Sequence, residues 1–373
     1  MKLKIKKNIF LEHLNYVIKG ISNKNLIPIL NCIKFELTQT GLFLISSNND
    51  ISIKTFIPEK EIEKIEKCGN VVISGKYIYE IIKKLPNDII TLEEIFNSTI
   101  AISTKGSSFK LNCNDVSEYP NIELEENKNP IILKSKLLKN IIHQTVFATS
   151  LQESRPILTG VNFKIKDNIL ECTATDSYRL SKKAVKLKEK IKDDINIIIP
   201  NRNIIELNKL LIEEDEDVEM HIFNNKIIFK FNNIIFMSRL INGTYPDTSK
   251  LIPNSFKIIL KVKLNEFYNS IDRASLLTNE NDKNTIRLET NNNEVKISSN
   301  IPEIGNVEEK LLVNNINKED IRISFSSKYM LEALRYLECD EIELLMNGEI
   351  KPIIIKNVEE DGLTQLILPI RTY

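Results

Sequence analysis

Charged side chains recur at one fixed step along this chain, and their types suit contact with phosphate groups. Two basic positions occur three times each at intervals of 126 residues: Lys76, Arg202 and Lys328, then Lys83, Lys209 and Arg335. A glutamate follows four residues after the first position each time, at Glu80, Glu206 and Glu332. A helix would place both basic positions on one face with the glutamate beside them. Such a face is either a solvated surface with weak ion pairs or, because it recurs, a surface that contacts phosphates without reading bases.

Other residue types that could carry chemistry lack the spacing that it requires. Residues 69–77 resemble a phosphate-binding loop, but there is one residue too many between the glycines, and a tyrosine holds the magnesium-binding position. His13, His143 and His221 lie in no nucleophile context, and we expect them at the surface or half-buried. The acidic run at 213–217 is typical of a solvated loop, and the five cysteines form no Cys-x-x-Cys pair. We therefore predict no catalytic residue, no metal and no cofactor.

The composition describes an ordinary folded protein without an excess of charge. Of 373 residues, 42% are hydrophobic, and 51 basic side chains balance 51 acidic ones. A protein that holds nucleic acid by neutralising phosphates is normally basic overall. The zero net charge of this chain therefore does not favour binding of nucleic acid through overall electrostatic attraction. No apolar run approaches the roughly 20 residues of a membrane span, and the basic start lacks a signal-peptide core. We expect a cytoplasmic chain with no membrane partner.

The repeat extends beyond the charged positions and sets the domain organisation. Residues 45–48 recur at 297–300, Asp50 recurs as Asp176, and a Tyr-Pro pair at residue 119 recurs at residue 245. Three copies of one unit therefore fill the chain, and internal repetition of this kind decides the architecture. Polar runs near residues 127 and 254 place the predicted domains at 1–127, 128–254 and 255–373.

Each predicted domain combines helix and strand patterns in two halves. Apolar residues at helical spacing open the domains, at residues 10–21, 137–142 and 264–271. Segments rich in β-formers follow, and another strand then leads into a second helix that carries the basic positions. We predict an α+β fold of three repeated domains, each made of two half-units of helix plus antiparallel strands, with the helices on one face of the sheets.

Four co-linear motifs make the chain resemble a known family. They occupy residues 155–163, 174–180, 245–247 and 368–373. In order and spacing they resemble the bacterial DNA polymerase III beta subunit, the sliding clamp family, over the whole chain. The resemblance implies a homodimer closed head to tail into a ring, with helices lining a hole around double-stranded DNA and sheets outside. It implies a replication processivity factor with no catalytic activity of its own. Contacts with phosphate can then stay weak, because a closed ring is retained topologically.

The resemblance also implies a hydrophobic groove between the second and third domains. This groove would capture short linear peptides of the replicative polymerase alpha subunit, the clamp loader and repair polymerases. Carried over by motif, its residues are Leu158, Thr175, Ser177, Tyr178, Arg179, Leu180, Pro246, Lys250, Leu251, Ile350, Leu368, Pro369, Ile370 and Arg371. Tyr178 stands where many relatives carry histidine, and Lys250 where arginine is frequent, so the peptide preference is left open.

Two further sets of residues follow from the same resemblance. Lys24, Gln152 and Arg155 join the six repeated basic residues as positions that face DNA. Phe109 and Leu111 of the first domain would meet Leu276 and Leu277 of the third domain of another copy, at the dimer interface. A competing interpretation is a repeat-built peptide-binding scaffold that does not act on DNA, which the zero net charge would suit.

Overall fold

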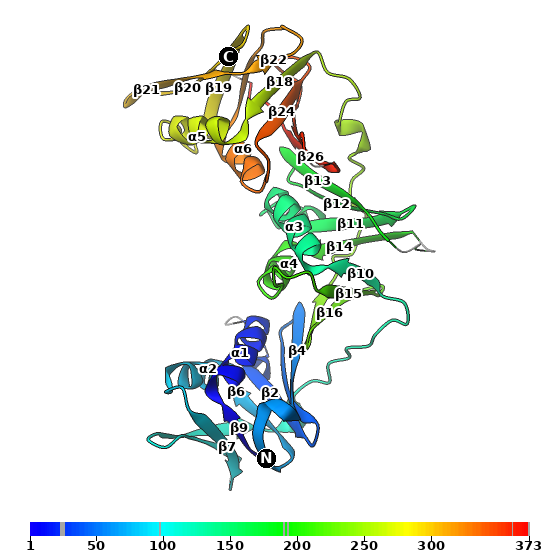
Figure 1. The fold of residues 1–373 in the computed structure, drawn as a ribbon, viewed down its shortest axis with the longest axis vertical. Helices are drawn as coiled ribbons and strands as arrows, with labels where there is room; N and C mark the ends of the chain where they lie inside the picture. The colour runs from blue at the N-terminus through cyan, green and yellow to red at the C-terminus, as the bar shows by residue number, and fades with distance from the viewer. Residues whose placement is uncertain (23–26, 97, 189–190, 192–193, 360, 372–373) are drawn as a thin grey trace. The chain divides into compact units, whose positions relative to one another are not determined.

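The computed structural model describes residues 1–22, 27–96, 98–188, 191, 194–359 and 361–371, and the fold is α+β, as predicted. Each domain runs twice through the order strand, helix, three strands, with one extra strand in the first and third domains (Figure 1). The predicted half-units are therefore confirmed. Within the described residues, each half-unit holds one α-helix.

The first domain shows how the predicted patterns become elements. Helix α2 buries Ile78 and Ile82 on one side and exposes Lys76 and Lys83 on the other, as the spacing predicted. The elements of this domain are β1 (Lys2–Lys6), α1 (Lys7–Val17), β2 (Cys32–Thr38), β3 (Gly41–Ser47), β4 (Ile51–Pro58), β5 (Ile62–Lys67), β6 (Gly69–Ser74), α2 (Gly75–Lys84), β7 (Ile89–Ile95), β8 (Thr99–Ser103) and β9 (Ser108–Asn114).

The central and third domains repeat this order. The central elements are β10 (Ile131–Lys134), α3 (Ser135–Thr145), β11 (Gly160–Lys166), β12 (Ile169–Thr175), β13 (Arg179–Lys186), β14 (Ile195–Pro200), α4 (Asn201–Asn208), β15 (Asp217–Ile222), β16 (Lys226–Phe231) and β17 (Ile234–Arg239). The third domain contains β18 (Ile258–Lys263), α5 (Leu264–Ser275), β19 (Thr285–Asn291), β20 (Glu294–Ile301), β21 (Gly305–Leu312), β22 (Asn314–Asn315), β23 (Arg322–Ser326), α6 (Ser327–Leu334), β24 (Glu341–Met346), β25 (Ile353–Asn357) and β26 (Leu363–Ile367).

Antiparallel sheets run across the domain junctions. Strand β17 of the central domain pairs with β4 of the first, and β13 of the central domain pairs with β26 of the third. The backbone accordingly divides into two compact units: unit 1 comprises residues 1–137 and 202–240, and unit 2 comprises residues 138–201 and 241–373. Each unit thus contains one terminal domain and part of the central one. The sheet orders are β10-β15-β16-β17-β4-β3-β2-β6-β9-β8-β7-β1-β5 in unit 1, and β14-β11-β12-β13-β26-β25-β24-β18-β22 with β21-β20-β19-β23 in unit 2.

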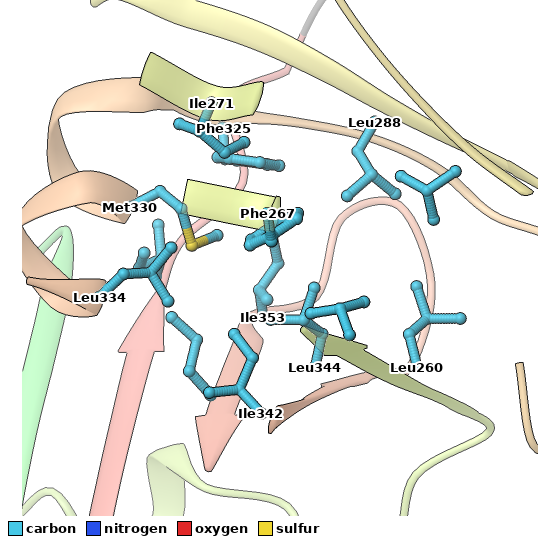
Figure 2. Packing of buried hydrophobic residues seen from close by; sticks show 14 of the residues in the cluster. Leu260, Phe267, Ile271, Leu288, Phe325, Met330, Leu334, Ile342, Leu344 and Ile353 are labelled. Carbon is cyan, nitrogen blue, oxygen red and sulfur yellow. The ribbon is translucent and has the colours of Figure 1, made fainter. Parts of the chain in front are cut away.

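The core of the third domain shows how a helix pair closes a sheet. Phe267 and Ile271 of α5 pack with Met330 and Leu334 of α6, and all four are at most 2% exposed (Figure 2). Aliphatic side chains of strands β18, β19, β24 and β25 complete the cluster. Burying a phenylalanine side chain contributes about 1.5–3 kcal/mol. This burial holds α6 in place, and α6 carries Lys328 and ends one residue before Arg335, two of the predicted basic positions.

Three sequence-based expectations need correction. Helix α1 ends at Val17 and is followed by a 3-10 helix over Ile18–Gly20, so the α-helix is shorter than the predicted stretch to residue 21, although helical structure continues to Gly20. His13 and His221 are buried, whereas we expected them near the surface; His13 Nδ1 lies 2.6 Å from Thr55 Oγ1. Asp50 is not the counterpart of Asp176, as the turn described below shows.

No helix among the described residues has the length and apolar content to cross a bilayer.

Candidate functional site

A cavity of about 700 Å³ lies in unit 2, where the short 3-10 helix Pro156–Thr159 meets the end of β12 and the segment before residue 251. Its lining residues are Ser154, Arg155, Pro156, Ile157, Leu158, Thr175, Ser177, Thr244, Pro246, Asp247, Thr248 and Leu251. Five predicted groove residues are among them. Arg155, which we predicted to face DNA, also lines this cavity.

A turn between β12 and β13 shapes one edge of the cavity. Asp176 Oδ1 accepts hydrogen bonds from the backbone N–H groups of Tyr178 (2.9 Å) and Arg179 (3.0 Å), which is an Asx-turn. Ser177 adopts φ 80° at its apex. In unit 1 the same two bonds converge on Asn48 Oδ1, from Asp50 (2.8 Å) and Ile51 (2.9 Å). Asn48 is therefore the true counterpart of Asp176, and the repeat is offset by two residues from the predicted register.

The buried side chain of Arg179 holds this turn in place. Its guanidinium, in a residue only 8% exposed, donates to Asp176 Oδ2 (3.0 Å), to Glu332 Oε2 on α6 and to the Phe147 carbonyl (2.5 Å). It also lies over the ring of Tyr329, 4.5 Å from the centroid. A planar guanidinium can satisfy all these partners at once, whereas a lysine ammonium could not. Arg179, predicted to be a contact residue of the groove, is thus mainly its support.

The residues after β26 lie beside the turn between β12 and β13, although none of them is among the residues that line the cavity. The Leu368 N–H donates to the Tyr178 carbonyl (2.9 Å), and the Ile370 N–H donates to the Ser324 carbonyl (2.7 Å). Leu368 is 38% exposed and Tyr178 is 58% exposed, so large apolar surfaces face solvent beside an ordered backbone. Exposed apolar walls with a few fixed polar groups suit a ligand of peptide size.

The remaining predicted groove residues differ in exposure. Leu180 is buried in a cluster with Leu345, Ile354 and Leu366, so it forms the floor beneath the surface. Pro369 and Ile370 are half-buried. The exposed members are Lys250, Leu251, Ile350 and Arg371.

Sequence reasoning missed several residues that hold the groove together. Asp176 and Glu332 anchor Arg179, and the buried Tyr245 hydroxyl accepts the Thr175 N–H (3.0 Å). Burial raises the pKa of Tyr245, so this hydroxyl stays protonated at neutral pH. The register had already singled out Glu332 and the Tyr-Pro pair, so a signal existed in the sequence. The partner of Glu332 could not be found from the sequence, because Arg179 lies 153 residues away from it.

The repeated basic residues lie on or directly after the second helix of each domain. Lys76 and Lys83 are on α2, Arg202 is on α4 and Lys328 is on α6; Lys209 and Arg335 follow their helices by one residue. All six are exposed. Glu206 pairs with Lys209 (2.6 Å), but Glu332 bonds Arg179 instead, so the three glutamates do not play one role. Gln152 is exposed, and Lys24 lies outside the described residues.

Two of the open strand edges in the described part of the chain lie close to the residues predicted for the dimer interface. Residues Ser108–Asn112 of β9 pair only with β8, because β6 meets β9 at Cys113 and Asn114 alone. Strand β21 pairs only with β20. The four residues that we predicted for a dimer interface lie at or near these edges: Phe109 and Leu111 are on β9, while Leu276 and Leu277 follow α5, and Leu276 is 79% exposed. Open edges of this kind pair readily with another strand.

One cluster outside these sites has metal-ligand residue types. Glu126, Glu219 and His221 bring their side-chain atoms within 4.8 Å of one another. His221 Nδ1 accepts the Asn127 N–H (2.8 Å), so the proton of the neutral ring is on Nε2, which faces Glu219 Oε2 at 3.2 Å. A metal at Nε2 would have to displace that proton while Nδ1 remained an acceptor. The histidine is therefore arranged to fasten the backbone at Asn127.

Solved structures that resemble this chain show which class of protein it belongs to. The Bacillus subtilis DNA polymerase sliding clamp has a solved structure that matches with a TM-score of 0.97 and 41% identity, over 100% of both chains. The Streptococcus pneumoniae DNA polymerase III beta chain matches with a TM-score of 0.95 and 35% identity, again over both full lengths. The fold is that of a DNA clamp with three repeated domains.

The family follows from the sequence matches. Residues 1–123, 132–247 and 249–371 match the N-terminal, central and C-terminal domains of the DNA polymerase III beta subunit. The Staphylococcus epidermidis beta sliding clamp is 42% identical over 377 residues, covering 100% of both proteins. The chain belongs to the DNA polymerase III beta subunit family. It is a processivity factor of DNA replication, and an accessory subunit of the polymerase rather than a catalytic one.

Proposed function

We propose that two copies of this chain close head to tail into a ring. The β9 edge of one copy would pair with the β21 edge of the other, with Phe109 and Leu111 against Leu276 and Leu277. Support comes from the two open edges and from the strong exposure of Leu276 beside one of them. The surfaces are unlike each other, so closure depends on a rotation that returns after two copies.

Duplex DNA passes through this ring and meets the repeated basic faces. The observation that carries the proposal is the recurrence of exposed cation pairs at equivalent positions of the second helix in all three domains. The formal net charge of zero suits such a device, since a closed ring needs no tight electrostatic grip and strong phosphate contacts would oppose sliding. The chain works in the cytoplasm, where a bacterial chromosome lies.

The groove of unit 2 takes short linear peptides of the replicative polymerase alpha subunit, the clamp loader and repair polymerases. A peptide would place apolar side chains against Leu158, Leu251 and Leu368, around the turn that Arg179 supports. Tyr178 contributes a broad aromatic surface at the rim, where about half of its area is free. The competing interpretation, a scaffold unrelated to DNA, loses its support with membership of a replication family.

Retention on DNA tests the ring. The protein is loaded by a clamp loader onto a nicked circular plasmid, and half of the sample is cut open with a restriction enzyme before gel filtration. We expect the protein to co-elute with the circle and to be lost from the linear form. Equal loss from both forms would defeat encirclement.

Sedimentation tests the interface separately. The wild-type chain should sediment as a dimer, and Leu276→Asp should shift it to a monomer by placing a carboxylate in an apolar contact. Leu151→Asp is a matched control, since Leu151 is 87% exposed and belongs to the central domain, which contains neither of the two proposed edges. A wild-type monomer at micromolar concentration, or dissociation by the control alone, would contradict the assignment.

A further inference from the structure

Unit 1 contains a second cavity, of about 350 Å³, which is formed by elements equivalent to those around the groove of unit 2. Its lining residues are Ile27, Leu30, Ser47, Asn48, Asn49, Ser52, Pro120, Asn121, Ile122, Glu123, Asn225, Lys226, Met237 and Arg239. We call it the counter-groove. Strand β17 of the central domain joins β4 of the first beside this cavity and contributes Met237 and Arg239 to its lining. In unit 2 β26 joins β13 in the same way, but no residue of β26 lines the cavity there.

The correspondence extends to individual residues. The tripeptide Pro-Ile-Leu opens a 3-10 helix at residues 28–30 in unit 1 and again at residues 156–158 in unit 2. Pro120 follows a buried tyrosine in one, and Pro246 does so in the other. The Arg239 N–H donates to the Asp50 carbonyl (2.8 Å), as the Leu368 N–H donates to the Tyr178 carbonyl. Arg239 is therefore the structural counterpart of Leu368.

The lining of the counter-groove combines apolar contacts with two cations, Lys226 and Arg239, against one carboxylate, that of Glu123. Ile27, 49% exposed, stands where the groove has Arg155, and it joins Leu30 and Met237. The Arg239 guanidinium is exposed and has no ion-pair or hydrogen-bond partner among the described residues. Lys226 Nζ donates to the backbone carbonyl of Glu123 (3.1 Å), not to a carboxylate, so its charge is not neutralised there.

The chemistry of the lining favours a peptide over a nucleic acid. None of the described residues that line the counter-groove is aromatic, so no platform for base stacking exists. Four asparagines line it instead, and three of them, Asn49, Asn121 and Asn225, have no side-chain hydrogen bond among the described residues. Each free amide offers both a donor and an acceptor, which match the groups of an extended peptide backbone.

We propose that the counter-groove binds a short, extended acidic peptide segment with one aliphatic side chain. The aliphatic group contacts Ile27, Leu30 and Met237, while carboxylates pair with Arg239 and Lys226. The Glu123 carboxylate lies at the rim and disfavours highly charged polyanions. This site goes beyond the peptide groove of unit 2 and needs neither ring closure nor DNA, so its test stands apart from that of the proposed function.

Methionine methyl groups provide a direct readout. The chain has five methionines, and Met1, Met220, Met330 and Met346 are at most 1% exposed, whereas Met237 lines the counter-groove. The full chain, labelled with ¹³C at the methionine methyls, is titrated with a synthetic peptide of one leucine flanked by glutamates. We expect the Met237 resonance alone to move, and to saturate. Equal movement with a glutamine-flanked peptide, or no movement, would overturn the proposal.

Charge reversal then tests the assigned residues. Arg239→Glu should weaken binding of the acidic peptide at least ten-fold, because an attraction becomes a repulsion. Lys166→Glu is the matched control, an exposed cation at a strand end of unit 2, and should change the affinity less than two-fold. The buried methionine resonances report whether each variant is folded. An unchanged affinity in folded Arg239→Glu overturns the proposal, as does a Met237 shift caused by a thymidine oligonucleotide and not by the peptide.

Discussion

The groove of unit 2 and the counter-groove of unit 1 share a backbone frame but not a chemistry. In both, a Pro-Ile-Leu 3-10 helix and an Asx-turn border a cavity, and a strand from the next domain pairs beside the turn. At matched positions, however, unit 2 has Leu368 and Tyr178 where unit 1 has Arg239 and Asp50. The frame sets where a ligand can lie, while these side chains set which ligand fits. Repetition of the fold therefore placed a cavity in each unit and lined the two with different side chains.

The turns of the two cavities are also supported differently. The first residue of β4 is Ile51, buried at 3% exposure, whereas the first residue of β13 is Arg179, whose guanidinium bonds Asp176 and Glu332. One turn rests on apolar burial and the other on a nearly buried charge network. As a result, Glu206 is available to Lys209, but Glu332 is not available to Arg335.

Removal of Arg179 should have the largest effect on this contrast. Arg179→Ala leaves the Asp176 and Glu332 carboxylates without their cation and should lower the free energy of unfolding by about 2–4 kcal/mol. Arg179→Lys should recover little of it, because an ammonium cannot reach three acceptors and stack on Tyr329. Thermal unfolding measures both, with the exposed Arg155→Ala as control at under about 0.5 kcal/mol. A fully stable Arg179→Lys would refute the network account.

Exchanging the matched side chains should have the next largest effect. Leu368→Arg gives the groove the charge of the counter-groove and should weaken binding of an apolar peptide about ten-fold, or about 1.4 kcal/mol. Arg239→Leu should leave that binding unchanged. Fluorescence anisotropy with a labelled leucine- and phenylalanine-containing peptide gives both affinities. Ile169→Arg, at an exposed position on β12, is the control. Equal losses from Leu368→Arg and Ile169→Arg would remove Leu368 from the site.

Much of the fold could be predicted because local patterns agree with tertiary packing. The exposed Lys76 and the buried Ile78 follow from one helical period, and tertiary contacts do not override it. The spacing of the apolar residues did not mark the change from α-helix to 3-10 helix after Val17. The burial of His13 was missed because Thr55, on a strand remote in sequence, supplies its hydrogen bond.

The site was less accessible to sequence reasoning than the fold. Leu158 and Pro246 could be placed at a groove only through family motifs, since their spacing alone indicates no cavity. The counter-groove escaped notice because the repeat register was two residues off around Asn48, which hid the match between the two Pro-Ile-Leu segments. The partner of Glu332 is set by long-range packing, which no local pattern records.

A smaller difference is expected between Lys209 and Arg335, the basic residues that directly follow helices α4 and α6. Lys209 is paired with Glu206, whereas Arg335 has lost the matching glutamate to Arg179, so Arg335 offers more net charge to phosphate. Arg335→Glu should therefore reduce the salt dependence of binding to a short duplex more than Lys209→Glu, by a slope change of about 1 per lost contact. The double variant should impair clamp-dependent synthesis yet remain dimeric. If the two single variants behave alike, Glu206 does not screen Lys209.

The smallest expected effect is a pH dependence confined to unit 1. Burial lowers the pKa of His13, so the unfolded chain takes up a proton at this site before the folded chain does as the pH falls. Its contribution to stability is complete above pH 6.5 and is lost as the pH falls through the lowered pKa of the folded state. Hydrogen exchange should show β4 amides losing protection over this range while β26 amides, in unit 2, keep theirs. The loss of protection at the β4 amides should not occur in His13→Gln. If β4 protection still falls with pH in this variant, groups other than His13 cause the pH dependence.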